Sequence, residues 1–101
     1  MYSKQFRLPI EKKKTIGGRS FSTPYFLLKE KDNKEGHNRF GIVIANHAVK
    51  SSARRHYWKR SIADELVKFP NLKKDILIIV SPKIESADKK TIQAELQKLI
   101  R

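Results

Sequence analysis

The sequence predicts an α+β fold in which a small mixed sheet is covered by helices. Strand-like and helix-like segments follow one another in the order helix, strand, strand, helix, strand, helix. One long helix separates the strands expected at residues 39–45 and 75–81, and such a crossover places its two strands parallel. A chain of 101 residues is long enough for one hydrophobic core, so residues 1–101 are expected to form a single domain.

The first half of the chain is expected to contain a short helix and two strands. Residues 11–16 have the composition for one or two helical turns, and a pair of glycines follows them. Residues 21–29 are rich in aromatic side chains and alternate as a strand does. Pro24 cannot donate to a strand ladder, which predicts an edge position or a bulge there. A polar turn at residues 31–38 then favours an antiparallel pair between the first two strands.

The long helix is expected at residues 51–69. Ser51 and Ser52 are candidate N-caps, and Pro70 ends the helix. Arg55 projects among the apolar positions, so its guanidinium must find a partner or extend over the sheet. The apolar side of the helix consists of Trp58, Ile62, Leu66 and Phe69.

The last strand and helix complete the expected core. Residues 75–81 form a nearly continuous apolar run, which is typical of a strand buried on both faces. A final helix begins near residues 86–88 and places Ile92, Leu96 and Leu99 at helical spacing. We expect both long helices to cover the same side of the sheet. The common core would contain Trp58, Ile62, Leu66, Ile78, Val80, Ile92 and Leu96.

The charge of the chain points to a polyanionic partner. Lysine and arginine total 23 against 10 acidic residues, which gives a net charge of +13 and a pI near 10.2. Such an excess is typical of nucleic-acid-binding domains. An anionic membrane surface is the competing partner, but no long segment combines cations with a wide apolar face. The apolar runs are too short to span a membrane, and the N-terminal residues lack a signal-peptide core, so we expect a cytoplasmic protein.

The cations concentrate around the long helix. No acidic residue lies between Glu35 and Asp64. Solvated surface helices usually alternate Glu with Lys, and the absence of such alternation favours nucleic-acid binding over a merely solvated face. The candidate RNA-binding residues are Lys50, Arg54, Arg55, His56, Lys59, Arg60, Arg19 and Arg39.

The aromatic residues of the first strand have two interpretations. Phe21, Tyr25 and Phe26 suit the core of a small sheet. Aromatic side chains exposed on a basic protein also serve as platforms for unpaired bases. Both alternatives remain open from the sequence.

With these residues in view, the chain resembles the protein subunit of bacterial ribonuclease P from about residue 19 to residue 100. That family has an Arg-apolar-Gly-apolar strand, followed at a fixed spacing by a helix of Arg-Asn-Arg-x-x-Lys-Arg character. Here RFGI at residues 39–42 precedes RHYWKR at residues 55–60 at the same spacing. His56 and Tyr57 replace the Asn and the second Arg of the family pattern.

The resemblance implies a ribosomal protein S5 domain 2-like fold and a role in tRNA 5′ maturation. The protein would bind ribonuclease P RNA and precursor tRNA, with Phe21, Tyr25 and Phe26 as candidate contacts to the 5′ leader. In that family the RNA subunit performs hydrolysis with bound Mg²⁺. No catalytic or metal-binding residue is therefore expected in the polypeptide, and no other protein partner is required.

Three other functions compete with this interpretation. A different ribosomal or ribonucleoprotein-assembly protein would share the charge and the basic helix without acting on tRNA. A duplex-DNA binder would need a second helix at helix-turn-helix spacing, which the chain lacks. An independent nuclease would need grouped carboxylates or paired histidines, but the acids are scattered and His37, His47 and His56 lie at no metal-ligand spacing.

Overall fold

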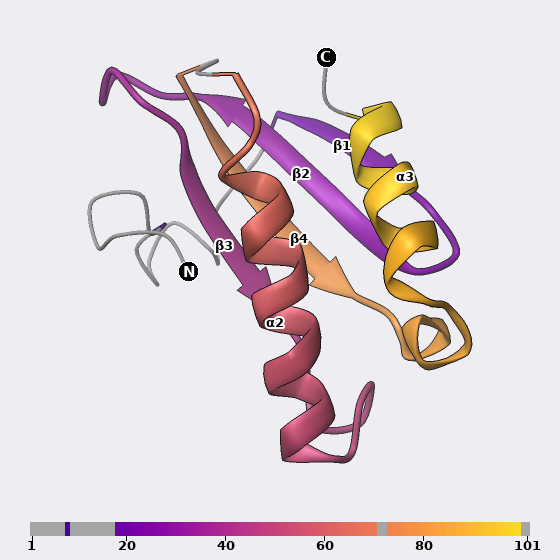
Figure 1. The fold of residues 1–101 in the computed structure, drawn as a ribbon. Coiled ribbons are helices and arrows are strands. Elements are labelled where there is room, and N and C mark those ends of the chain that lie inside the picture. The colour runs from indigo at the N-terminus through magenta and orange to yellow at the C-terminus, as the bar shows by residue number, and fades with distance from the viewer. Residues whose placement is uncertain (1–7, 9–17, 71–72, 100–101) are drawn as a thin grey trace.

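A computed structural model describes residues 8, 18–70 and 73–99 of the chain. Within them lie the strands β1 (Arg19–Ser22), β2 (Phe26–Asp32), β3 (Arg39–Val43) and β4 (Lys74–Val80), the helices α2 (Ser52–Leu66) and α3 (Lys89–Leu99), and a short 3₁₀ helix, η2 (Pro82–Ser86) (Figure 1). The α+β class is confirmed. The helix predicted at residues 11–16 lies outside the described residues.

The strands form one mixed sheet in the order β1-β2-β4-β3. β3 and β4 pair in parallel, as predicted for the two strands that flank α2. The predicted antiparallel pairing between the strands at residues 21–29 and 39–45 is wrong, because β4 lies between β2 and β3 and pairs with both. The apolar run of β4 explains this order, since a strand that is buried on both faces belongs at the centre of a sheet.

The single strand predicted at residues 21–29 is a hairpin of β1 and β2. The N–H of Thr23 donates to the carbonyl oxygen of Phe26 at 2.9 Å, and the Thr23 hydroxyl accepts from the N–H groups of Tyr25 and Phe26 at 3.1 Å each. Pro24 lies inside this turn, where its fixed φ is suitable and a missing N–H costs nothing. The proline therefore separates two strands and does not mark a bulge within one.

The α2 helix begins where the sequence predicts and ends three residues earlier. Ser51 is the N-cap, and its hydroxyl accepts from the N–H of Arg54 at 3.2 Å. After Leu66 the chain tightens, because the N–H of Phe69 donates to the carbonyl oxygen of Leu66, three residues back. Pro70 disfavours helical geometry at the residue before it, which accounts for the early end.

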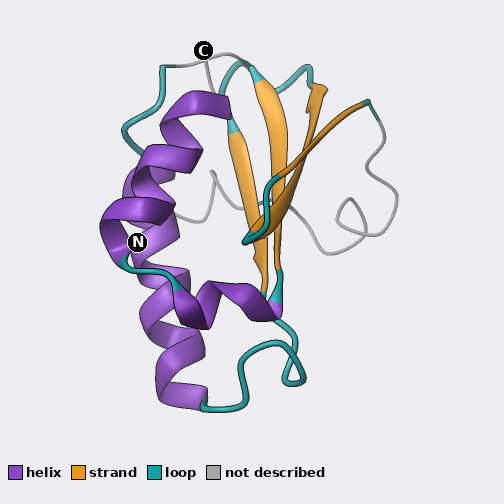
Figure 2. Cartoon of the chain, turned by 90° about the vertical axis from the view of Figure 1, so that its right-hand side faces the viewer, coloured by secondary structure: helices purple, strands orange, loops and turns teal. Residues whose placement is uncertain are grey.

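Both long helices cover the same face of the sheet, as predicted (Figure 2). Strand alternation directs Phe26 and Leu28 of β2 and Ile76 and Ile78 of β4 toward the helices. The whole predicted core is confirmed as buried, with Trp58, Ile62, Leu66, Ile78, Val80, Ile92 and Leu96 in one cluster. Among the described residues, no helix is long and apolar enough to cross a membrane.

Candidate nucleic-acid interface

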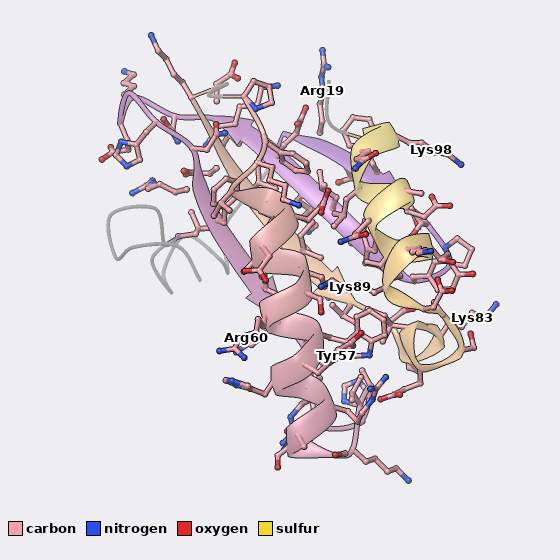
Figure 3. The ribbon with its side chains drawn as sticks, in the orientation of Figure 1. Arg19, Tyr57, Arg60, Lys83, Lys89 and Lys98 are labelled. Carbon is pink, nitrogen blue, oxygen red and sulfur yellow. The ribbon has the colours of Figure 1, made fainter. Side chains whose placement is uncertain are left out.

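The exposed side of α2 carries cations that have no acidic partner in the part of the chain that the structure describes. Lys50, Lys59 and Arg60 are exposed, with His56 between them, and we call these four residues the α2 cationic face. In the described part of the chain, none of them forms an ion pair. Figure 3 shows Arg60 on the flank of α2 away from α3. Their side chains are therefore available to phosphate groups.

Arg54, also predicted to bind RNA, is partly engaged within the protein. Its Nε lies 3.6 Å from Oε2 of Glu85, which η2 supplies, and both side chains are close to half exposed. The Arg54 guanidinium also lies over the ring of Tyr57, 4.7 Å from its centroid. Sequence reasoning missed Glu85, because η2 approaches α2 only in the folded chain.

Arg55 finds the partner that its apolar position required. Its Nη1 donates to the carbonyl oxygens of Val49 and Lys50 at 2.8 and 2.9 Å. These bonds hold the loop that leads into α2, and the side chain is only partly exposed. Arg55 therefore fixes the position of Lys50 relative to the helix.

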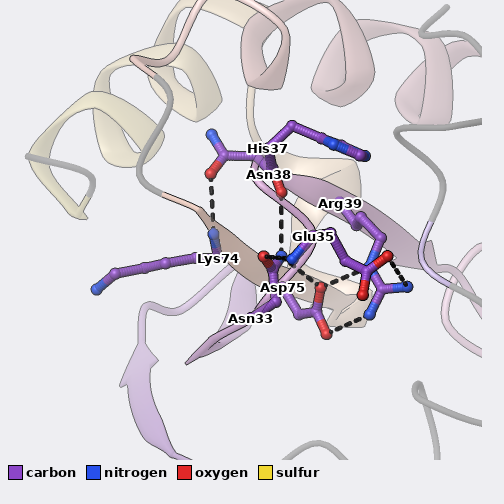
Figure 4. Close-up of polar contacts among 7 residues, drawn as sticks. All are labelled: Asn33, Glu35, His37, Asn38, Arg39, Lys74 and Asp75. Atoms are coloured by element: carbon purple, nitrogen blue, oxygen red, sulfur yellow. Dashed lines mark hydrogen bonds and ion pairs between the residues drawn. The ribbon is translucent and has the colours of Figure 1, made fainter.

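Arg39, another predicted RNA contact, is committed to a buried ion pair (Figure 4). Its Nε and Nη2 donate to the two carboxylate oxygens of Asp75 at 2.8 and 2.9 Å. Asp75 is 6% exposed, and Asn33 donates a further hydrogen bond of 2.9 Å to it. The hydrogen bond with Asp75 raises the pKa of Arg39 above its usual value. We therefore assign Arg39 a role in stabilising the fold, because Asp75 already engages its guanidinium in a bidentate pair.

Arg19 and the aromatic residues occupy different surroundings. Arg19 is exposed at the start of β1 (Figure 3). Phe21 and Tyr25 are partly buried against the core. Phe26 is 1% exposed because strand alternation turns it toward the helices, so we withdraw it as a contact to an unpaired base.

The opposite face of the sheet carries residues that sequence reasoning did not select. Leu27 and Lys29 of β2 alternate with the buried positions, and Ile79 of β4 is the register partner of Leu27. Val43 of β3 pairs with Ile79 and is 37% exposed. The alternation along β2 could have indicated these residues, but only if the face covered by the helices had been known.

The acidic residues of the described segments show no grouping suited to a metal. Within the described residues, no three His, Asp or Glu side chains are close enough together to hold a metal ion. Several carboxylates are instead paired with cations: Glu30 with Lys74, Asp75 with Arg39, and Glu85 with Arg54.

The family model for Ribonuclease P matches residues 11–101. The chain belongs to the ribonuclease P protein family. Solved ribonuclease P proteins share its fold. A Staphylococcus aureus variant is 25% identical with a TM-score of 0.84, covering 94% of this chain and 85% of its own. The Thermotoga maritima protein is 24% identical with a TM-score of 0.77, covering 93% of this chain and 94% of its own. No protein of curated function matches the sequence.

Family membership fixes the broad role of this ribonuclease P protein. It is the protein subunit of the ribonucleoprotein that matures the 5′ end of tRNA, and its partner is ribonuclease P RNA. The α2 cationic face belongs to the helix that carries the family's basic signature. Tyr57 lies in the same helix, between His56 and Trp58.

Proposed function

We propose that this ribonuclease P protein binds ribonuclease P RNA through the α2 cationic face and helps the complex to hold precursor tRNA. The observation that supports this most strongly is the exposure of Lys50, Lys59 and Arg60, which form no ion pair among the described residues. Each phosphate that such a cation neutralises releases a condensed counterion, which supplies affinity with little sequence preference. Ribonuclease P RNA gains a compact fold at lower Mg²⁺ because protein cations supply part of the screening.

Hydrolysis belongs to the RNA subunit and its Mg²⁺, and the polypeptide contributes no catalytic group. Protein nucleases that use two metals gather carboxylates around them. Here Glu30, Asp75 and Glu85 are engaged with cations, and Asp88 caps α3. The side chains of the described part of the chain thus support binding and positioning of RNA.

The single-stranded 5′ leader is assigned to the sheet face opposite the helices. That face presents the partly exposed apolar residues Leu27, Val43 and Ile79 beside Lys29. Apolar side chains can contact bases while a lysine contacts the backbone, a combination that tolerates any sequence. This assignment replaces the one based on Phe26, whose ring lies in the core.

A reconstitution tests the proposed function. The protein is combined with its cognate ribonuclease P RNA, and precursor-tRNA cleavage is measured against Mg²⁺ concentration. We expect the protein to lower the Mg²⁺ requirement and to cleave nothing by itself. Arg60→Ala should weaken the effect, and Asp64→Ala is the matched control because it removes an exposed charge of opposite sign four residues away.

Two results would contradict the proposal. Cleavage by the protein without RNA, lost in Asp64→Ala, would make the polypeptide itself a nuclease. RNA binding with no effect on cleavage at any Mg²⁺ concentration would instead favour a role in another ribonucleoprotein.

A further inference from the structure

Tyr57 is an exposed aromatic residue on the RNA-binding helix. It is 39% exposed, and it is the one aromatic side chain among the large hydrophobic residues exposed in the described part of the chain. Figure 3 shows it on the flank of α2 that faces η2 and α3. Its neighbours on the outer side of α2 are mostly polar, so packing against apolar side chains does not account for its exposed position.

The ring of Tyr57 is held in place by two neighbours. The fully buried Trp58 meets it edge-on, with centroids 5.1 Å apart and planes at 75°. Arg54 lies over the ring at 4.7 Å, and Glu85 holds the guanidinium of Arg54 from η2. Since the ring is already ordered, a ligand that stacks on it loses little additional conformational entropy.

We propose that Tyr57 is a stacking site for an unpaired base of ribonuclease P RNA, with Arg54 as its cationic support. Every nucleobase offers a π-face, so stacking on a tyrosine needs no particular sequence. An arginine over an aromatic ring adds cation–π attraction and positive potential beside the incoming nucleotide. This inference rests on the proposed function and names one subsite within it.

The position of Tyr57 favours ribonuclease P RNA over the 5′ leader. Tyr57 belongs to α2, and the helices cover the sheet face opposite to Leu27 and Ile79, where the leader is assigned (Figure 2). Arg54 lies over the Tyr57 ring and its side chain is close to half exposed, so its guanidinium adds positive charge beside a stacked nucleotide. A nucleotide offers both an aromatic base that can stack on Tyr57 and a negative phosphate that the neighbouring Arg54 attracts.

Binding measurements with two conservative variants test the stacking site. Affinity for ribonuclease P RNA is measured across a salt series for the wild type, Tyr57→Phe and Tyr57→Leu. Tyr57→Phe should bind as the wild type does, and Tyr57→Leu should bind about 5- to 100-fold more weakly. The loss should be the same at every salt concentration because stacking releases no counterions. Equal binding by Tyr57→Leu, or equal loss in both variants, would overturn the proposal.

A fluorescence measurement provides a second, independent readout. Tyr57→Trp places an indole at the site, and a stacked base should quench its emission when ribonuclease P RNA is added. In the wild-type protein the only tryptophan is the buried Trp58, which provides the matched background. The same small change in both proteins would contradict stacking at this position, even if the Tyr57→Leu variant proved unstable.

Comparison of cleavage and RNA affinity distinguishes a failure of the stacking site from a failure of the proposed function. If the wild type stimulates cleavage and Tyr57→Leu matches it in RNA affinity, the stacking site is wrong and the proposed function stands. If the wild type gives no stimulation, the proposed function itself fails. A loss in Tyr57→Leu that is confined to precursor-tRNA binding by the assembled complex would overturn the assignment to ribonuclease P RNA.

Discussion

Two regions of this ribonuclease P protein use cations in opposite ways. At the end of the sheet, Arg39 is paired with Asp75 and Lys74 with Glu30, and both carboxylates are buried; we call these four residues the strand-end cluster. On the outer side of α2, the cationic face is exposed and has no acidic partner among the described residues. The residue types are similar, but the surroundings decide whether a cation serves the fold or the RNA.

The difference follows from the cost of removing a charge from water. A buried carboxylate must be paired and hydrogen-bonded, because an unpaired charge in a low-dielectric interior costs several kcal/mol. Exposed cations on a helix repel one another only weakly in water, and their collective field attracts a polyanion. Loss of a cation should therefore affect folding in the strand-end cluster and RNA binding on the α2 cationic face.

The largest effect is expected for Arg39→Ala. This change leaves Asp75 buried without its cation and should lower the free energy of unfolding by roughly 3–5 kcal/mol. Urea denaturation provides the measurement. Arg60→Ala is the matched control, since it removes an exposed arginine and should change stability by no more than about 0.5 kcal/mol. Similar losses in both variants would remove the distinction between the two regions.

The next effect concerns RNA affinity and not stability. Changing Lys59 and Arg60 together to Ala should leave the fold intact and flatten the slope of log affinity against log salt by about one to two units. Lys89 and Lys90 of α3, both exposed, form the control pair when changed together to Ala. An equal flattening in the control would show that net charge matters and that the position of the charge on α2 does not.

The two regions also differ in how far the sequence predicts them. The α2 helix, its Ser51 cap and its buried side follow from local signals, namely a capping residue and a period of 3.6. The pair of Arg39 and Asp75 joins residues 36 positions apart, and it depends on the register between β3 and β4. Sequence reasoning therefore selected Arg39 as an RNA contact, because its charge was visible and its partner was not.

The position of β4 illustrates the same limit. Its burial and its parallel pairing with β3 were predictable from an apolar run that follows a helical crossover. Its insertion between β2 and β3 was not predictable, because a polar turn can join two strands that form a hairpin or two strands that do not pair with each other. That insertion decides which face of β2 the helices cover, and so it decides that Phe26 is buried while Leu27 is not fully covered.

The smallest effect is expected for Asp88, whose carboxylate is held mainly by hydrogen bonds from the neutral Thr91. The hydroxyl and the N–H of Thr91 donate to Oδ1 of Asp88 at 2.7 and 2.8 Å, and these bonds, the hydroxyl first, lower the pKa of Asp88 below its usual value of 3.8. Because the folded-state pKa is depressed, the stabilisation is complete above the ordinary Asp pKa and is lost as the pH falls through the folded-state pKa. Asp88→Asn accepts the same bonds but cannot ionise. The stability difference between the wild type and Asp88→Asn should therefore shrink on acidification.

Thr91→Val serves as the graded control for this prediction. Valine keeps the β-branched shape and the backbone N–H but removes the hydroxyl, the largest cause of the shift, so the pH dependence contributed by Asp88 should become smaller without vanishing. Acid unfolding curves of the three proteins at several salt concentrations provide the measurement. Since the main donors are neutral, added salt should change the Asp88 contribution little, whereas it should weaken RNA binding by the α2 cationic face. A stability difference between the wild type and Asp88→Asn that stays constant with pH would show that Asp88 acts only as an uncharged cap.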